Sequence, residues 1–112
     1  MSSTDADRVR SPLLDELVSR LVQAYDPEQV CLFGSVARGD AGPDSDYDIL
    51  VIVPDDATPE RCRAKAGYEA LWGLARSGDI LVCTRHRFES RVDVPWSIPD
   101  AVAREGIVLY GA

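Results

Sequence analysis

The feature that most constrains this chain is a Gly-Ser pair followed, ten residues later, by two aspartates that open an apolar run. Gly34 and Ser35 come directly after the apolar residues 30–33, and Asp46 and Asp48 lead into the apolar residues 49–53. Both runs have the length of buried β-strands. The sequence therefore predicts a Gly-Ser turn at the end of one strand and a carboxylate pair at the start of the next.

The two aspartates are separated by one residue. If Asp48 begins a strand, the side chains of Asp46 and Asp48 project from the same face of the sheet. Two carboxylates about 5 to 7 Å apart repel each other by roughly 2 to 3 kcal/mol at an effective dielectric constant of about 20, and a divalent cation removes this cost. Oxygen ligands suit Mg²⁺ or Mn²⁺, which take further ligands from substrate phosphates. The pair therefore predicts a metal-dependent reaction of a nucleoside triphosphate.

Gly34 and Ser35 stand where a strand passes directly into a helix. Backbone N–H groups at a helix N-terminus attract phosphate, and glycine lets the backbone approach it closely. Alternatively, the pair only makes a tight turn in which Ser35 is the N-cap of the helix. Arg38 lies one turn further on, where it can reach a phosphate oxygen or pair with a nearby aspartate, and the sequence leaves both open.

A third carboxylate, Asp79, opens the apolar run 80–83 after residues 76–78. At a strand start it can bind the metal that activates an attacking oxygen, or accept the proton of that oxygen. The alternative is that Asp79 only completes a Gly-Asp turn.

The stretch from Gly34 to Asp48, with Arg38-Gly39 and with Ser45 before the first aspartate, resembles the minimal nucleotidyltransferases of the DNA polymerase β superfamily. The closing residues 104–110 are also similar to the ends of such chains, so the resemblance covers about residues 30–110. It implies an α/β nucleotidyltransferase fold, two Mg²⁺ ions (or Mn²⁺) and ATP as substrate. The site residues that it implies are Gly34, Ser35, Arg38 and Ser45 for the nucleotide, and Asp46, Asp48 and Asp79 for metal binding and catalysis.

The resemblance also implies a function. Short members of this family are often encoded beside HEPN-domain proteins and act as the antitoxin by modifying a tyrosine of that partner. We therefore expect transfer of AMP from ATP to a protein hydroxyl with release of pyrophosphate. Two alternatives stay open: an antitoxin that neutralises its partner sterically without catalysis, and a transferase for a small hydroxylated metabolite. The working form can be a homodimer or a hetero-oligomer.

The charge of the chain disfavours direct binding of nucleic acid. Its net charge is −7, and six acidic residues fall between Asp40 and Asp56 with no lysine or arginine among them. A nucleic-acid backbone is normally met by clustered basic residues. The three cysteines form no Cys-x-x-Cys pair, and neither a signal peptide nor an apolar run of 18 residues is present. We therefore expect reduced cysteines, a cytoplasmic location and no membrane partner.

The remaining pattern predicts a polar tail over residues 1–10 and one domain over residues 11–112. Helices are expected from Ser11-Pro12 to Pro27, from Thr58-Pro59 to about residue 76, over residues 85–90 and over residues 95–103, with a last strand over residues 107–110. In the second helix, one buried face should carry Tyr68, Leu71, Trp72 and Ala75. This order of elements predicts an α/β fold with helices packed on one side of a small mixed sheet.

Overall fold

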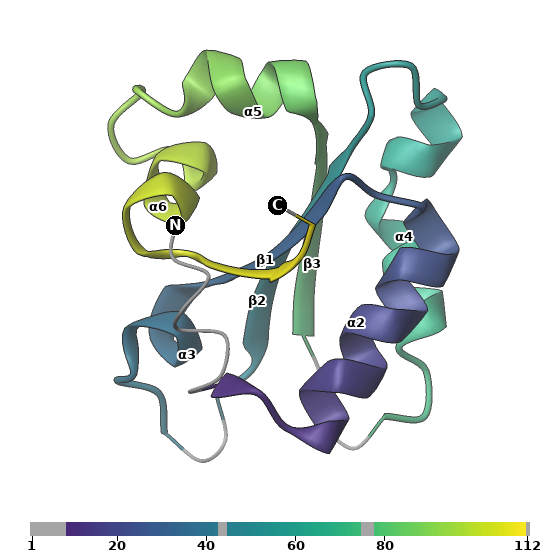
Figure 1. The fold of residues 1–112 in the computed structure, drawn as a ribbon, viewed down its shortest axis with the longest axis vertical. Helices are drawn as coiled ribbons and strands as arrows, with labels where there is room; N and C mark the ends of the chain where they lie inside the picture. The colour runs from purple at the N-terminus through teal and green to yellow at the C-terminus, as the bar shows by residue number, and fades with distance from the viewer. Residues whose placement is uncertain (1–8, 43–44, 75–77, 112) are drawn as a thin grey trace.

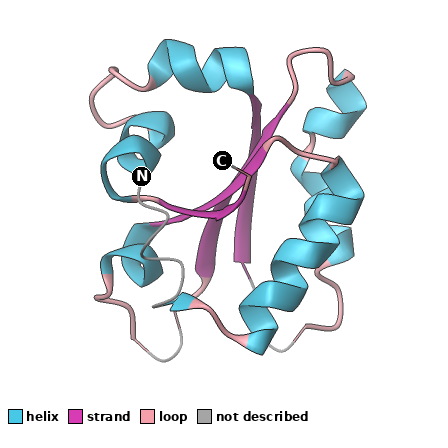
Figure 2. Cartoon of the chain, in the orientation of Figure 1, coloured by secondary structure: helices cyan, strands magenta, loops and turns pink. Residues whose placement is uncertain are grey.

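The computed structural model describes residues 9–42, 45–74 and 78–111, and it contains a four-stranded mixed sheet in the order β3-β2-β1-β4 (Figures 1 and 2). The central strand β1 is antiparallel to both of its neighbours, whereas β2 and β3 are parallel. The strands are β1 (Gln29–Phe33), β2 (Tyr47–Val53), β3 (Gly78–Thr84) and β4 (Ile107–Tyr110). The four predicted strands and the mixed sheet are thereby confirmed.

Helices connect these strands and cover both faces of the sheet (Figure 1). The helices α2 and α4 lie on one face, α5 and α6 lie on the other, and α3 follows β1 directly. Their bounds are α2 (Pro12–Tyr25), α3 (Gly34–Arg38), the short 3₁₀ helix η1 (Pro59–Cys62), α4 (Ala64–Ala70), α5 (Arg85–Arg91) and α6 (Ile98–Glu105).

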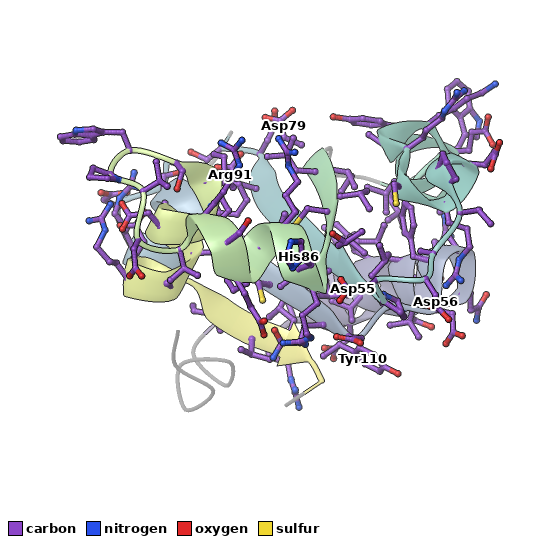
Figure 3. All side chains as sticks on the ribbon, turned by 90° about the horizontal axis from the view of Figure 1, so that it is seen from above. Asp55, Asp56, Asp79, His86, Arg91 and Tyr110 are labelled. Carbon is purple, nitrogen blue, oxygen red and sulfur yellow. The ribbon has the colours of Figure 1, made fainter. Side chains whose placement is uncertain are left out.

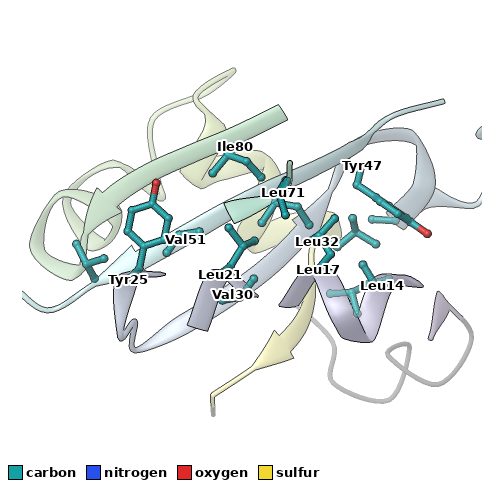
Figure 4. Close-up of a cluster of buried hydrophobic side chains, with 14 residues drawn as sticks. Leu14, Leu17, Leu21, Tyr25, Val30, Leu32, Tyr47, Val51, Leu71 and Ile80 are labelled. Atoms are coloured by element: carbon teal, nitrogen blue, oxygen red, sulfur yellow. The ribbon is translucent and has the colours of Figure 1, made fainter. Parts of the chain in front are cut away.

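The larger core lies between the sheet and α2. Ser11 caps this helix by accepting a hydrogen bond from the Leu14 N–H at 3.1 Å, and Pro12 occupies the first turn, where its missing N–H costs nothing. Leu14, Leu17 and Leu21 then recur at helical spacing and are almost completely buried. Figure 4 shows these side chains packed against apolar side chains of the strands. The predicted N-terminal helix is confirmed.

A second, smaller core lies on the opposite face of the sheet. Phe88 of α5 and Val102 of α6 pack there against Cys31, Phe33, Leu50 and Ile52. The expectation that the helices pack on one side therefore holds for α2 and α4 but is wrong for α5 and α6. The strands β1 and β2 are apolar at nearly every position, which is typical of strands that are covered on both faces.

The long helix expected over residues 58–76 is broken and shorter. It starts at Pro59 as predicted, but the extended backbone of Arg63 separates η1 from α4, and α4 ends at Ala70. The prediction of its buried face is also wrong for two residues, because Tyr68 and Trp72 are 48% and 86% exposed, whereas Leu71 is buried as predicted. Ala75, the fourth predicted member of that face, lies outside the described residues.

The smaller predictions fare differently. The short helix expected over 95–103 begins only after the N-cap Ser97 and runs as α6 to Glu105, because Ser97 accepts a hydrogen bond from the Asp100 N–H. The predicted tail lies outside the described residues except for Val9, which packs on the larger core, and Arg10. All three cysteines are free. Within the described part of the chain, no helix is long and apolar enough to span a membrane.

Candidate functional site

The strand register brings two of the three predicted acids to one face of the sheet. In the parallel pair β2–β3, Asp48 lies directly opposite Asp79. Paired residues of neighbouring strands project from the same face, and Asp46, two residues before Asp48, is expected to share it. The carboxylates lie at one end of the sheet, where β2 and β3 both begin. Residues that are 31 positions apart in the sequence are thereby placed side by side.

Gly34 lies against this carboxylate group. Phe33, the residue before it, is paired with Asp48 across β1 and β2. The backbone of Gly34 has a φ of +76°, and a Cβ at this position would come within 2.2 Å of the Asp48 Oδ2 atom. A positive φ and the absence of space both require glycine here. Gly34 and Asp48, one residue from each of the two halves that the sequence suggests for the site, therefore lie against each other.

Ser35 belongs to the first turn of α3 and is not its N-cap. The N-cap position is taken by Phe33, whose side chain makes no capping hydrogen bond, and α3 begins at Gly34. The alternative in which Ser35 only caps the helix is therefore excluded. The N-terminus of α3 lacks a side-chain cap and lies beside Asp48, so a phosphate group near the carboxylates can meet it.

The electrostatics of the acids favour a cation. Partial burial of Asp48 raises the pKa of its carboxyl group above the ordinary value, and the negative charges of Asp79 and Asp46 raise it further. Arg38 acts in the opposite direction on the same group. Asp46 and Asp79 are exposed. A divalent cation at this point would relieve the repulsion, because its charge stabilises the ionised form of each carboxylate.

In the described residues, no three His, Cys, Asp or Glu side chains converge closely enough to hold a metal ion by themselves. The acids Asp46, Asp48 and Asp79 therefore do not form a complete metal centre by themselves, and a cation bound to them would need further ligands from phosphate oxygens and water. Mg²⁺ commonly binds in this way, through one or two carboxylates and a substrate phosphate.

The other two predicted residues make local contacts. The Arg38 guanidinium donates to Asp40 Oδ2 at 3.1 Å and to Glu105 Oε1 at 3.0 Å. Of the two roles that the sequence left open, a phosphate contact or a pair with a nearby aspartate, the structure shows the pair with Asp40. Ser45 accepts a hydrogen bond from the Gly42 N–H at 3.0 Å through its hydroxyl oxygen. This contact holds together the loop that leads to Asp46.

A cavity of about 440 Å³ next to the carboxylates has no counterpart in the sequence-based prediction. Its walls come from β2, β3, α5, the segment before α6 and the first turn of α6, and they include Leu81, Arg91 and Trp96. Figure 3 shows Asp79 and Arg91 on the same side of the molecule, away from Asp55 and Tyr110. No motif or spacing in the sequence indicates this cavity, because its walls come from segments that are far apart in the chain.

Comparison with known proteins agrees with this geometry. The family model described as a nucleotidyltransferase domain matches residues 14–109. No match is found among the curated proteins. Among solved structures, a protein of Sulfolobus solfataricus provisionally identified as a nucleotidyltransferase is similar, with a TM-score of 0.61 and 21% identity over 99% of this chain and 88% of that one.

A second solved structure, of a toxin-antitoxin with AMP-PNP, is similar with a TM-score of 0.56 and 19% identity over 88% of this chain and 73% of that one. At these identities, the two structures show a shared fold. The family model spans most of the chain and includes the Gly-Ser pair and all three acids. The chain therefore belongs to the nucleotidyltransferase domain family.

Proposed function

We propose that this chain transfers AMP from ATP to a hydroxyl group of a partner protein, with Mg²⁺, as the antitoxin of a HEPN-type toxin-antitoxin pair. The observation that carries the proposal is the register of β2 and β3, which places Asp48 opposite Asp79 beside Gly34. The family match supports nucleotidyl transfer, and the similar toxin-antitoxin structure supports a protein partner.

In this proposal, Asp46 and Asp48 would hold the metal ions, which would supply positive charge to the phosphates and to the departing oxygen. The backbone of Gly34 and the hydroxyl of Ser35 bind the β- and γ-phosphates at the start of α3. Asp79 accepts the proton of the attacking hydroxyl. A new bond forms between that oxygen and the α-phosphorus, the bond from the α-phosphorus to the bridging oxygen breaks, and pyrophosphate leaves.

The proposal is tested by incubating the purified chain with α-labelled ATP, Mg²⁺ and the protein product of the adjacent gene. We expect covalent label on the partner protein. Asp46→Asn should reduce the rate roughly a hundredfold or more, because it removes a metal ligand. Asp56→Asn is the matched control, since Asp56 is exposed and lies away from Asp79 in Figure 3, and it should label at the wild-type rate.

Two results would contradict the proposal. Transfer that survives Asp46→Asn would mean that the carboxylates do not carry the reaction. A tight complex with no label for any of the common nucleoside triphosphates would favour an antitoxin that acts by covering its partner. Label on a small hydroxylated metabolite, with none on the protein, would favour the metabolite transferase.

A further inference from the structure

The cavity of about 440 Å³ is built mainly from apolar side chains with two arginines at its wall. Leu50 and Leu81 come from the sheet, Arg87 and Arg91 from α5, Trp96 from the segment that leads into α6, and Ile98 from the start of α6. Several of its apolar side chains face solvent: Leu81 and Ile98 are about two-fifths exposed and Trp96 is 93% exposed. Apolar side chains gathered around a hollow in this way are typical of a binding surface.

This cavity continues the surface that carries the acids. Leu50 follows Asp48 by two residues and Leu81 follows Asp79 by two residues, so each leucine shares the sheet face of the aspartate before it. Two residues along a strand correspond to about 7 Å. A molecule that fills the cavity therefore extends to the reacting centre of the proposed transfer.

The cavity also lies on the side from which the acceptor must arrive. The start of α3, where the proposed function places the phosphates, is next to β1, whereas β3 borders β2 on the other side. In an in-line displacement, the attacking oxygen approaches opposite to the leaving pyrophosphate. The attacking hydroxyl must therefore come from the β3 side, beside Asp79 and Leu81.

The charge of the cavity wall is unusual for this chain. Of the arginines that the structure describes, five are ion-paired to carboxylates and Arg61 donates to the backbone oxygens of Tyr25 and Asp26. Within the described residues, the guanidinium groups of Arg63, Arg87 and Arg91 have no ion pair or hydrogen bond. In a chain of net charge −7, two of these three unpaired arginines line one cavity. They can pair with anionic groups of a bound molecule.

Trp96 is held in its exposed position by the backbone. Its φ is +69°, a left-handed conformation that a tryptophan adopts only when surrounding contacts impose it. Those contacts are present: the hydroxyl of Ser97 donates to the backbone oxygens of Arg91 and Val94, and the Trp96 N–H donates to Asp100. The indole ring is thereby presented to solvent at the rim of the cavity, where it can cover a bound side chain.

We propose that this cavity is the docking site for the acceptor segment of the partner protein, an extended peptide that places an apolar side chain in the cavity, its reacting hydroxyl over Asp79 and acidic residues against Arg87 and Arg91. The proposal rests on the proposed function, since that function requires a protein acceptor. In an extended peptide, side chains on one face are two residues and about 7 Å apart. The apolar residue should therefore lie two positions from the hydroxyl residue.

Binding can be measured without transfer. Trp72→Phe leaves Trp96 as the single tryptophan, so its fluorescence reports on the rim of the cavity. The probes are two peptides that carry a tyrosine with a leucine two positions away, one with glutamates at all other positions and one with lysines. Each is titrated in Mg²⁺ and an ATP analogue with a methylene group in place of the oxygen between the α- and β-phosphates. The acidic peptide should bind about tenfold or more tightly than the basic one.

The double substitution Arg87→Glu and Arg91→Glu should reverse this preference. Arg63→Glu is the matched control, because Arg63 is also exposed and unpaired but does not line the cavity, and it should keep the preference. Circular dichroism of each variant checks that it is folded. A third peptide, with the leucine next to the tyrosine, should bind more weakly than the peptide with the leucine two positions away.

Three outcomes would overturn the proposal. The first two are equal binding of the acidic and basic peptides, and a preference for the acidic peptide that the charge reversal leaves unchanged. The third is a change of Trp96 fluorescence that the ATP analogue causes alone and that added peptide reverses by competition. The last result would assign the cavity to the nucleoside. Failure of the proposed function is separate from these outcomes, because it would appear as a folded chain that binds the acidic peptide and transfers nothing.

Discussion

At Gly34, two independent constraints meet in one residue. Its φ of +76° disfavours any residue with a Cβ, and the space where that Cβ would lie is taken by the Asp48 carboxylate. Glycine is therefore needed for the conformation of the chain and for the position of the acid. A substitution here should disturb stability and activity together.

The structure allows these two effects to be separated. Gly73 also has a positive φ, of +86°, but open space around it, so Gly73→Ala should cost only the conformational strain of about 1 kcal/mol. Gly34→Ala adds a steric conflict with Asp48 and should lower the free energy of unfolding by about 2 kcal/mol or more. Urea unfolding of both variants measures the difference. Equal losses would mean that the Asp48 side chain moves aside at no cost.

Between elements, one phenol hydroxyl fixes the distance from α2 to α4. The Tyr25 Oη atom donates to the Arg63 backbone oxygen at 2.6 Å and accepts from the Gly67 N–H at 2.8 Å. Gly67 is buried against Tyr25 and Ile80, and a Cβ there would lie 2.8 Å from a methyl carbon of Ile80. The helix α4 thus approaches the sheet through a glycine, with a tyrosine as its hydrogen-bonding partner.

Tyr25→Phe should therefore destabilise the domain more than the loss of one exposed hydrogen bond would. The buried Gly67 N–H loses its acceptor and finds no water, which costs about 2 kcal/mol. Tyr110→Phe is the control, because Tyr110 is 40% exposed, and it should change stability by less than about 0.5 kcal/mol. Chemical denaturation of the two variants gives the comparison. A loss from Tyr25→Phe no larger than that from Tyr110→Phe would show that water replaces the hydroxyl.

The contact of Gly67 with Tyr25 and Ile80 shows why sequence-based prediction succeeded for α2 but failed for α4. Capping residues and the spacing of leucines predict α2 well, and uninterrupted apolar runs predict β1 and β2, because both signals come from large buried side chains. In α4 the buried residue is Gly67, while Tyr68 of this helix and Trp72, which follows it, are exposed. A search for large apolar residues therefore selects the wrong face.

Tyr68 nevertheless has a structural role, since its hydroxyl accepts a hydrogen bond from the backbone N–H of Ile80 in the edge strand β3. The acids could be predicted because they lie at strand starts, where side chains two residues apart project from the same face of the sheet. The cavity could not be predicted, because its walls come from separate segments that meet only when α5 and α6 pack on the sheet. Local pattern carries no information about that packing.

At the scale of the whole molecule, the proposed site opposes folding stability. The net charge is −7, and Asp48 and Asp79 lie side by side at one end of the sheet, with Asp46 two residues before Asp48. Burial first, and then the charges of Asp79 and Asp46, raise the pKa of Asp48 in the folded state above its value in the unfolded chain. A carboxyl group with a raised pKa reduces stability when it is ionised. This reduction develops as the pH rises from the unfolded-state pKa to the folded-state pKa, and it is absent in more acidic solution.

Asp48→Asn should accordingly make the metal-free protein more stable at neutral pH, and the gain should shrink to nothing as the pH falls below the ordinary pKa of an aspartate. Thermal unfolding in a chelator over a series of pH values tests this, with Asp56→Asn as the exposed control that should show no such gain. Adding Mg²⁺ with nucleotide should raise the melting temperature of the wild type and not that of Asp48→Asn. A gain from Asp48→Asn that persists undiminished in acid would have to come from a cause other than charge.

The pairing of β2 with β3 also determines which changes of chain length the domain can accept. Asp79 is positioned by hydrogen bonds between two strands, so the number of residues between Val53 and Gly78 has no influence on where it stands. That connection, which includes η1 and α4, can lengthen or shorten in related chains while the third acid keeps its place. A single residue inserted within β3 before Asp79 would instead turn the carboxylate to the opposite face of the sheet. The domain can therefore accept many inserted residues before Gly78, whereas one residue inserted between Gly78 and Asp79 would remove the third acid from the site.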